Sequence, residues 1–531
     1  MTTHDRFLDS PYAFTGPQPP QGFNMAAYVI GRAARAQPGK TALIVYDDAG
    51  ARQALETWTY ADLEGAVLRL AGGLLARGLR KGDRLLIRLD NTSSYALLFF
   101  AAIAAGLVPI ATSTQLTAAE ADFLLSDSQS RAVALADHLL DWRVPGGIDV
   151  IGAGDVAEML RSAVARGYAA TAVDDPAYMV YTSGTTANPK GVLHAHRAAW
   201  GRRPMYQGWY GISAADRMLH AGAFNWTFTL GSGLTDPWAN GATAIIYTGE
   251  KSPEIWPRLI EASGATLFAA VPGVYRQILK YARPEDLNRL ATLRHGLMAG
   301  EAPPDGLFDA WAAATGRQIH EALGMSEIST FISCSPGLPR RSGTIGRAQP
   351  GRSVTVLPEG DGETPLAPGE PGLLAVHRSD PGLMLGYWQR SEEERDVWRG
   401  EWFVGGDFAA IDRDGYVTHH GRANDIMKAL GYRVAPQEVE AVLARHPKIA
   451  DVGCSELRVR DDLSVIAAYV VPLSLEALPD REEIMSFAAS RLAPYKCPRE
   501  IVLVEGLPRT ANGKLLRRAL GTAPRVHEHE A

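Results

Sequence analysis

Short apolar segments that alternate with helix-like segments constrain this fold most strongly. Residues 63–79 carry apolar side chains at helical spacing, and a turn then leads into the apolar run 85–89. A helix capped by Ser93 or Ser94 follows, and the chain becomes extended again at 108–111. Strand, helix and strand in this order form a βαβ unit, which requires a parallel sheet with helices on its faces. We therefore predict an α/β fold built on parallel sheets.

The alternation continues through most of the chain and changes near the C-terminal end. Further strand candidates recur at 132–136, 242–247, 266–271 and 296–299. From 350 to 386, Gly and Pro interrupt short extended runs, which predicts a β-rich subdomain. A polar stretch at 419–425 then precedes a tail of short helices and strands. We predict a large N-terminal domain, residues 1–421, and a small α+β C-terminal domain, residues 426–531, joined by residues 422–425.

Composition and charge exclude several classes of protein. The 531 residues are too many for one hydrophobic core, and 46% apolar with 21% charged residues is typical of folded protein. The net charge of −6 provides no basic field for a nucleic acid, so local groups must hold any anionic ligand. The three cysteines form no CxxC pair, which argues against a disulfide framework or a thiolate metal site. A reducing compartment such as the cytoplasm is expected.

Neither a secretory signal nor a membrane span is predicted. The first residues combine no basic region with an apolar one, as a signal peptide would. The longest apolar run, 95–111, is short for a membrane span and contains Gly106 and Pro109. A buried helix followed by a strand is the preferred interpretation.

The segment 181–191, YTSGTTANPKG, is the most informative for function. Glycine permits close backbone approach to an anion, Ser and Thr donate hydrogen bonds, and Lys190 adds positive charge. The segment is therefore a candidate phosphate-binding loop, although the GxxxxGK[ST] spacing of a Walker A loop is absent. Taken alone, the same composition is compatible with an ordinary surface turn.

Two further loops follow strand candidates, GEAPP at 300–304 and HEALGMSE at 320–327. Open α/β sheets bind ligands at the carboxyl ends of their strands. A carboxylate there, such as Glu327, could hold Mg²⁺ beside a triphosphate. The alternative for any single glutamate is a solvated acidic loop residue.

Together these motifs resemble those of the adenylate-forming superfamily, which includes acyl-CoA synthetases, firefly-type luciferases and peptide-synthetase adenylation domains. The resemblance extends over essentially the full length of the chain. Its motifs are YTSGTTANPKG at 181–191, GEAPP at 300–304, LGMSE at 323–327, GEWFVGGDFAAIDRDGYVTHHGR at 400–422, NDIMKALGYRVAPQEVE at 424–440 and PRTANGK at 508–514.

The resemblance implies a binding site for ATP. In the family, the first loop wraps the β- and γ-phosphates and frees pyrophosphate, and the next two motifs line the adenine pocket. Glu327 would ligate Mg²⁺. The other implied nucleotide-binding residues are Thr182, Ser183, Gly184, Thr185, Thr186, Lys190, Gly300, Glu301, Ala302, Pro303, Glu321, Ala322, Leu323, Ser326, Asp407 and Arg422.

The resemblance also implies distinct roles for the charged residues near the C-terminal end. Asp407 would accept both ribose hydroxyls, and Arg422 would support the same sugar. Lys514 and Glu327 would be the catalytic residues. Lys514 would offset the repulsion between the substrate carboxylate and the α-phosphate. Without the family context, Lys514 reads as a solvated lysine after a turn.

The family's reaction has two steps. A carboxylate attacks the α-phosphate of Mg·ATP to give an acyl-adenylate and pyrophosphate, and the thiol of coenzyme A then takes the acyl group. Between the steps the C-terminal domain turns about a hinge, here expected at Asn424. A loop that matches Lys428, Gly431 and Tyr432 would then face coenzyme A. ATP, Mg²⁺ and coenzyme A are the expected cofactors.

Three residues depart from the family pattern. The hinge usually has Asp or Lys, and Asn424 removes that ion pairing. Leu323 stands where an aromatic residue commonly stacks on adenine, which predicts weaker nucleotide binding. Ser326 replaces the family's Thr before Glu327 and keeps the hydroxyl.

The acyl pocket is implied by motif position. Amino-acid-activating relatives place an Asp within 221–227, where this chain has Trp226, which implies an acid with an uncharged tail. The pocket is expected to be mainly apolar and suited to an aromatic or a short-to-medium aliphatic acid. The stretch 226–243 looks closest to medium-chain and benzoate-type ligases. The implied pocket residues are Phe224, Trp226, Ala299, Ala322, Gly324 and Ser329, of which Phe224 is equally compatible with plain core.

The leading prediction is an AMP-forming acyl-CoA ligase, in aromatic acid or fatty acid metabolism. One alternative is a ligase that passes the acyl group to a carrier protein, and another is a nucleotide-binding homologue without catalysis. The motif PxxxxGK at 508–514 resembles a site at which bacterial relatives are acetylated, so a protein acetyltransferase acting on Lys514 is an expected partner. Cys334 has no evident His partner and is predicted to be structural.

Overall fold

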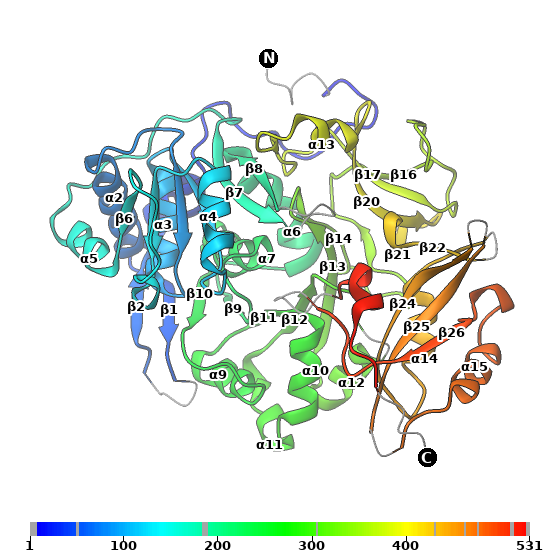
Figure 1. The fold of residues 1–531 in the computed structure, drawn as a ribbon. Helices are drawn as coiled ribbons and strands as arrows, with labels where there is room; N and C mark the ends of the chain where they lie inside the picture. Colours follow the sequence, from blue (N-terminus) through cyan, green and yellow to red (C-terminus); the bar gives the residue numbers. More distant parts are fainter. Residues whose placement is uncertain are drawn as a thin grey trace. The chain divides into compact units, whose positions relative to one another are not determined.

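The computed structural model of the chain divides into two compact units (Figure 1). The residues that it describes are 8–48, 53–182, 189–303, 306–429, 432–460, 463–474, 477–509 and 515–526. The first unit comprises Met1–Ala302, Gly306–Val354 and Val376–Phe403. The second comprises Pro303–Asp305, Thr355–Ala375 and Val404–Ala531.

The smaller sheet of the first unit is mainly parallel, as predicted. Its strand order is β18-β8-β7-β4-β3-β5-β6, with β8 antiparallel to both of its neighbours. The other neighbours run parallel because crossovers return the chain to the same end of the sheet. The strands are β3 Arg84–Arg88, β4 Val108–Ala111, β5 Ala132–Leu135, β6 Asp149–Ile151, β7 Pro176–Thr182, β8 Lys190–Ala195 and β18 Gly386–Tyr387.

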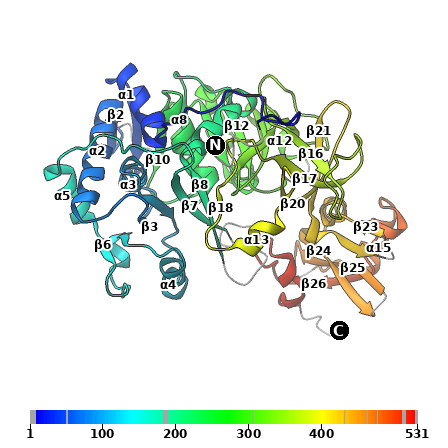
Figure 2. The same cartoon turned by 90° about the horizontal axis from the view of Figure 1, so that it is seen from above.

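Helices α2, α3 and α5 lie together beside this sheet (Figures 1 and 2). Thr59 closes the capping box that begins α2. The predicted cap of α3, Ser93 or Ser94, was wrong by one or two residues, because Thr92 has the extended backbone of a cap and accepts from the N–H of Tyr95. The helices are α2 Tyr60–Ala76, α3 Ser93–Ala104, α4 Ala118–Asp127 and α5 Ala153–Ser162.

The apolar run near α3 forms a buried helix and a strand. Every residue of α3 except Ser94 is buried, and β4 follows it. Within the described ranges, no helix is both long and apolar enough to cross a membrane. The prediction of a core helix is confirmed.

The larger sheet of the first unit has a parallel centre and antiparallel edges. Within this unit its order is β15-β14-β13-β12-β11-β9-β10-β1-β2. The strands β13, β12, β11, β9, β10 and β1 are parallel to one another, whereas β2, β14 and β15 are antiparallel to their neighbours. The strands are β1 Thr41–Tyr46, β2 Glu56–Thr59, β9 Arg217–His220, β10 Thr243–Tyr247, β11 Leu267–Ala270, β12 His295–Ala299, β13 Gln318–Met325, β14 Ser329–Ser333 and β15 Gly346–Ala348.

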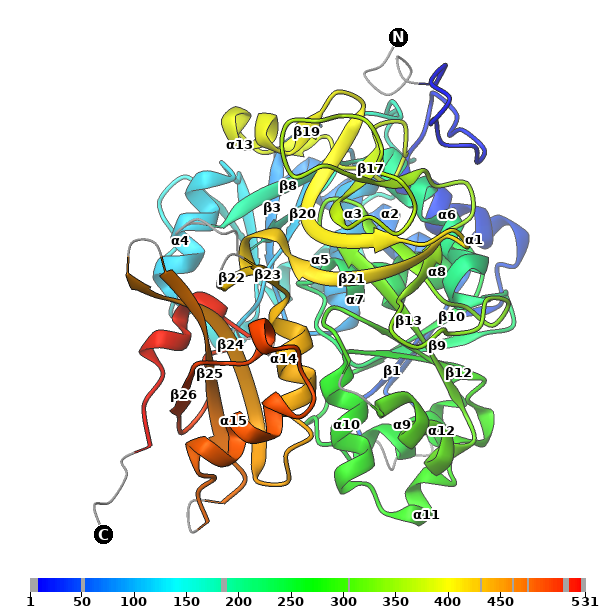
Figure 3. The ribbon, with the colours of Figure 1, turned by 90° about the vertical axis from the view of Figure 1, so that its right-hand side faces the viewer.

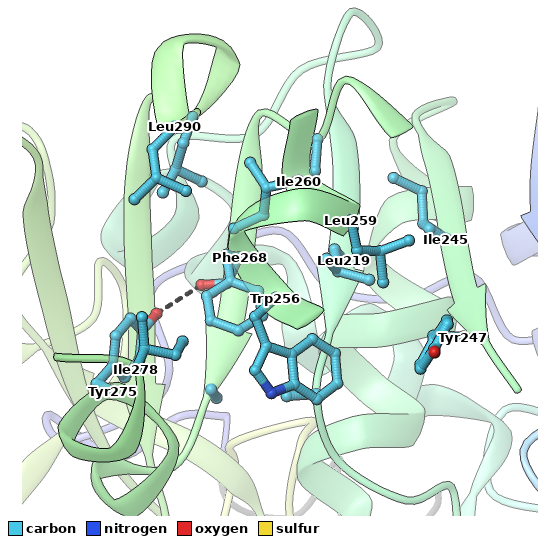
Figure 4. Packing of buried hydrophobic residues seen from close by; sticks show 14 of the residues in the cluster. Leu219, Ile245, Tyr247, Trp256, Leu259, Ile260, Phe268, Tyr275, Ile278 and Leu290 are labelled. Carbon is cyan, nitrogen blue, oxygen red and sulfur yellow. Dashed lines mark hydrogen bonds between the residues drawn. The ribbon is translucent and has the colours of Figure 1, made fainter. Parts of the chain in front are cut away.

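Both faces of the larger sheet are buried, and alternate residues enter two different cores. Leu219 and Phe268 pack with Trp256 and Tyr275 from the helices α9 Ile255–Ser263 and α10 Pro272–Tyr281 (Figure 4). Met218 and the residues flanking Phe268 enter the opposite core with Trp209 and Tyr210. This period of two follows from the strand geometry and explains why these strands are almost continuously apolar.

The second unit contains short strands followed by an α+β region. It holds all of β21 Tyr416–Arg422 and most of β16 Val354–Leu357, β17 Gly372–His377 and β20 Trp402–Ile411, which are neighbours in the order β16-β17-β20-β21. Figure 3 shows β24 and β25 as long paired strands with α14 and α15 beside them. These elements are β24 Ile449–Arg460, β25 Leu463–Pro472, β26 Glu500–Leu503, α14 Pro436–Leu443 and α15 Arg481–Ala489.

The boundary between the two compact units differs from the domain boundary that the sequence predicts. It places residues 404–421 in the second unit, whereas the sequence assigned them to the N-terminal domain. The division into compact units does not test where the chain turns. The hinge at 422–425 and the domains 1–421 and 426–531 therefore stay predictions.

The hydroxyl of Tyr275, in the core drawn in Figure 4, links two strands. Its removal therefore tests how much these hydrogen bonds stabilise the fold. The hydroxyl donates to the carbonyl of Phe268 at 2.8 Å and accepts from the N–H of Leu297 at 3.0 Å. Tyr275→Phe leaves both backbone groups without this partner in a buried place. We expect the free energy of unfolding to fall by about 1–3 kcal/mol, measured by denaturant unfolding. Tyr281→Phe, at a half-exposed residue, is the control and should change nothing; equal stability of both variants would contradict the prediction.

Candidate active site

The first group of predicted residues gathers where β12 and β13 end. Ala299, the last residue of β12, pairs with Ala322 of β13. Gly300 follows with a φ of +104°, a left-handed conformation that favours glycine. A Cβ atom on Gly300 would lie 2.6 Å from Cη2 of Trp226, so glycine lets the indole approach. Trp226, predicted for the acyl pocket, therefore contacts the start of the loop predicted for adenine.

The rest of that loop is described only in part. Glu301 and Ala302 continue it within the first unit. Pro303 is the last residue described before the next gap and clusters with the second unit. Their contact with a nucleotide stays a prediction.

A second group joins Glu327 and Lys190 through a tyrosine. The hydroxyl of Tyr387 donates to Oε1 of Glu327 at 2.7 Å, and Nζ of Lys190 lies 5.3 Å from the centre of the same ring. Lys190 begins β8 and pairs with Thr182 at the end of β7. The two ends of the predicted phosphate-binding loop are therefore held beside Glu327. The sequence reasoning missed Tyr387, whose only signal was a Gly-Tyr pair after an apolar segment.

The donor atoms in this group fit Mg²⁺ that arrives with a triphosphate. Mg²⁺ is usually held by one or two carboxylates, and water and substrate phosphates complete its coordination. Glu327 supplies one such carboxylate. In the described part of the chain, no cluster of three His, Cys, Asp or Glu side chains could hold a metal.

Ser326 is fixed from the smaller sheet. Nε2 of His194 lies 2.8 Å from the carbonyl oxygen of Ser326, and the ring of Tyr178 stacks on the imidazole. Burial lowers the pKa of His194 to about 4, so the imidazole is neutral and its Nε2–H donates to that carbonyl. The segment from Leu323 to Glu327 is thus anchored at its penultimate residue.

A buried ion pair between Arg202 and Asp236 is hydrogen-bonded to Ser329, a residue predicted for the acyl pocket. Nη1 of Arg202 donates to Oγ of Ser329, a non-glycine residue with a φ of +74°. The same guanidinium makes two hydrogen bonds to Asp236, of 2.7 and 2.6 Å, and Tyr210 donates to Asp236 at 2.7 Å. Ser329 also packs on Gly324, where a Cβ atom would lie 2.6 Å from the carbonyl oxygen of Ser329. The sequence reasoning missed Arg202, because nothing local indicates that a distant Asp is its partner.

The surroundings of Phe224 are compatible with a core residue as well as with a residue of the acyl pocket. Its side chain is 3% exposed, and its ring lies 5.4 Å from that of Tyr95, whereas Trp226 is only partly buried. Asn91 fixes the same loop, since it accepts from the N–H of Phe224 at 3.0 Å and donates to the carbonyl of Gly222 at 2.7 Å. Phe224 thus forms the base of the loop that carries Trp226.

Glu321 is a buried carboxyl group among the residues predicted for adenine. It is 9% exposed, and burial raises its pKa to about 8. Its backbone N–H donates to Sγ of Cys334 at 3.1 Å, and burial raises the pKa of that thiol to about 11. Cys334 therefore stays protonated near neutral pH, which agrees with a structural role.

The predicted ribose-binding residues lie opposite each other in the second unit. Asp407 of β20 pairs with Arg422 of β21, and Nη1 of Arg422 lies 3.6 Å from Oδ2 of Asp407. Arg422 also donates to the carbonyl of Gly405. His419, which the sequence reasoning did not single out, contacts the same carboxylate at 3.0 Å.

The predicted hinge and coenzyme A loop follow directly. Asn424 lies in the single helical turn Ala423–Asp425. Lys428 and Tyr432 lie on β22 Met427–Ala429 and β23 Tyr432–Val434, two paired antiparallel strands. Gly431 lies between these strands, outside the described residues. The relation of these residues to coenzyme A stays a prediction.

Several predicted residues lie outside the described ranges, namely Ser183, Gly184, Thr185, Thr186 and Lys514. The residues that flank Lys514 are anchored within the second unit. Arg509 forms a bridge with Leu515 and an ion pair of 2.7 Å with Asp451. Arg517 donates to Oε2 of Glu440 on α14 at 2.8 Å.

A surface hollow of about 580 Å³ contains none of the predicted residues. It is lined by β2 and the first turns of α2, including Glu56, Trp58 and Arg69. The predicted site residues of the first unit that the structure describes lie instead after β9, at and after the end of β12, along and after β13, and at the facing ends of β7 and β8. The hollow is therefore a feature separate from them.

Two family models match the chain. The model of the AMP-binding enzyme matches residues 30–388, and the model of the AMP-binding enzyme C-terminal domain matches residues 438–514. The unmatched interval contains the predicted hinge at 422–425.

Similar proteins include ligases for different acids. The benzoate–CoA ligase of Thauera aromatica is 31% identical over 525 residues, covering 95% of this chain and 97% of that protein. The long-chain-fatty-acid–CoA ligase FadD13 of Mycobacterium tuberculosis is 30% identical over 486 residues, covering 87% and 92%. The crystal structure of a benzoate CoA ligase from Burkholderia xenovorans LB400 has 30% identity and a TM-score of 0.81, covering 94% of this chain and 99% of that one.

Glu321 generates a pH-dependent prediction. Its folded-state pKa of about 8 exceeds the ordinary value of 4.5, so the folded chain keeps this proton to higher pH than the unfolded chain. The group therefore lowers stability progressively as pH rises between these two values. Glu321→Gln removes the effect, and its melting temperature should rise relative to the wild type between about pH 5.5 and about pH 8.5. Glu392→Gln, at a surface side chain that is 87% exposed, is the control. A difference between Glu321→Gln and the wild type that does not change with pH would refute the prediction.

Proposed function

Because the chain belongs to the AMP-binding enzyme family, we propose that it is an ATP-dependent carboxylate–CoA ligase. The carboxylate of the acid attacks the α-phosphate of ATP, an acyl-adenylate forms, and pyrophosphate leaves. The thiol of coenzyme A then attacks the acyl carbon, and AMP leaves with the electrons of the broken acyl–phosphate bond. The products are acyl-CoA, AMP and pyrophosphate.

The observation that carries this proposal is the contact of Tyr387 with both Glu327 and Lys190. A triphosphate needs positive charge and a metal ligand close together, and these two residues supply them at the ends of the predicted phosphate-binding loop. Mg²⁺ bound at Glu327 would neutralise the phosphates of ATP. Lys190 would contribute a second positive charge beside them.

Lys514 has the central role in the first step. Two anions, the carboxylate and the α-phosphate, must approach each other, and a lysine ammonium group lowers their repulsion. It also stabilises the charge that spreads over the phosphoryl oxygens in the transition state.

The acid is proposed to be aromatic and benzoate-like. Trp226, Phe228, Ala299 and Ala322 meet in one apolar cluster, and the ring of Trp226 stands edge-on to that of Phe228. Aromatic side chains in such an arrangement favour a flat apolar ligand. The benzoate-activating relatives support this class, and the FadD13 relative keeps an aliphatic acid as the second candidate.

Two other functions remain as alternatives. A carrier-protein ligase would form the same acyl-adenylate and pass the acyl group to a protein-bound thiol. A nucleotide-binding homologue would bind ATP without turnover. Acetylation of Lys514 by a protein acetyltransferase is a further prediction, and it would remove the charge that adenylation needs.

An acid panel tests the substrate class. Pyrophosphate release is measured with benzoate, hydroxybenzoates, branched short acids and straight-chain fatty acids from short to long. We expect the highest kcat/KM for a benzoate, because a flat acid fits beside Trp226. A preference for a long-chain acid would contradict the aromatic assignment. Adenylation of the acid without AMP formation on addition of coenzyme A would favour the carrier-protein alternative.

Lys514→Ala tests the catalytic assignment. Adenylation should fall by at least about a hundredfold, since one charge that stabilises the transition state is lost. Thioester formation from preformed acyl-AMP should stay at the wild-type rate, because that step does not need the lysine. Lys448→Ala, which removes an ion pair of 2.8 Å with Glu483 in the same unit, is the matched control. A wild-type rate of adenylation in Lys514→Ala would overturn the assignment.

A further inference from the structure

Two polar side chains of the second unit, His419 and Arg422, meet at the carboxylate of Asp407. Nε2 of His419 lies 3.0 Å from Oδ1 of Asp407, and Nη1 of Arg422 lies 3.6 Å from Oδ2. The side chain of Asp407 is 7% exposed, and that of His419 is 20% exposed. The carboxylate is thus held between an imidazole and a guanidinium in a largely buried place.

A β-bulge brings these side chains to the same face of the β20–β21 pair. Asp407 pairs with Arg422, but Ala409, two residues along β20, pairs with His419, three residues back along β21. His420 is therefore the extra residue of a bulge. In a regular ladder, residues three apart point to opposite faces. The extra residue shifts the register by one and turns His419 toward Asp407.

Two glycines permit this backbone. Gly421, within the bulge, has a φ of +102°, and Gly406, just before Asp407, has a φ of +83°. A Cβ atom on Gly421 would also lie 2.5 Å from Nε2 of Gln437. Bulges that redirect a side chain occur often beside functional sites. The position of His419 is therefore set by backbone geometry and does not depend on a flexible side chain.

The next histidine along the strand has different surroundings. The ring of His420 lies 6.1 Å from that of Phe408, and Nδ1 lies 4.0 Å from Oε1 of Glu438. Phe408 and Asp407 are adjacent in β20 and so point to opposite faces. His420 thus offers a control of the same residue type in the same strand.

We propose that His419 is a positioning residue for the ribose of the nucleotide. It holds the carboxylate of Asp407 in the orientation that accepts the ribose hydroxyls, and the inference rests on the proposed function, which assigns Asp407 to that sugar. An ionised carboxylate accepts several hydrogen bonds, so it can accept from His419 and from a hydroxyl at once. An acceptor that is already fixed loses less conformational freedom when the ligand binds.

Equilibrium binding of ATP and of 2′,3′-dideoxy-ATP, measured by isothermal titration calorimetry, tests this role. His419→Ala should weaken ATP binding about five- to tenfold, the loss expected for a misplaced charged acceptor. Binding of 2′,3′-dideoxy-ATP should not change, because that nucleotide has no ribose hydroxyls for Asp407 to accept. His419→Gln keeps an N–H donor and should recover part of the loss, and His420→Ala should leave the ratio between the nucleotides as in the wild type.

The outcomes separate this inference from the proposed function. If His419→Ala weakens both nucleotides equally, or neither, His419 has no role toward the ribose. If thermal melting shows that His419→Ala is unfolded, His419→Met takes its place in the binding experiment. Methionine fills a similar space and has no N–H donor. A wild type that binds no ATP overturns both proposals. A wild type that binds ATP but activates no acid overturns only the ligase proposal, and the comparison of the two nucleotides still decides the role of His419.

Discussion

The larger sheet of the first unit must bury both of its faces, and much of the structure depends on this requirement. Its parallel strands send Leu219 and Phe268 into one core and Met218 and Leu267 into the other. Because helices and loops cover both faces, a ligand can reach the strands only at their ends. Ala299 and Gly300 lie at and just after the end of β12, beside Ala322 of β13, and the second core contains the side chains that Trp226 packs against.

Individual charged side chains, and not the net charge of the chain, must hold its anionic ligands. A net charge of −6 does not attract anionic ligands, yet the proposed reaction uses three of them, ATP, the acid and coenzyme A. Two buried arginines form structural ion pairs, Arg202 with Asp236 and Arg352 with Asp380, each at 2.6 Å. A paired charge in a buried place fixes the backbone around it, and removing one partner would be costly. Lys190 and Arg422 instead lie beside residues that the proposed function assigns to the nucleotide.

The sequence predicted those parts of the fold that depend on local patterns. The buried helix α3 and the strand 108–111 follow from neighbouring side chains, and both are confirmed. The cap of α3 was misplaced by one or two residues, because Thr92, Ser93 and Ser94 are all good cap residue types and only the backbone conformation distinguishes them. The family motifs indicated Glu327 and Trp226 but not the residues that hold them.

The sequence by itself determined the class of fold, the order of the motifs and the residue types able to bind a triphosphate. These properties depend on period, composition and local spacing, which are all present in the one-dimensional chain. Only the tertiary structure decided that Tyr387 joins Glu327 to Lys190, that Arg202 supports Ser329, and that a bulge turns His419 toward Asp407. Most of these contacts join residues far apart in the chain. The contact between His419 and Asp407, which are closest in sequence, depends on one extra residue in a strand. Strand register and packing therefore set them, and no local pattern encodes either.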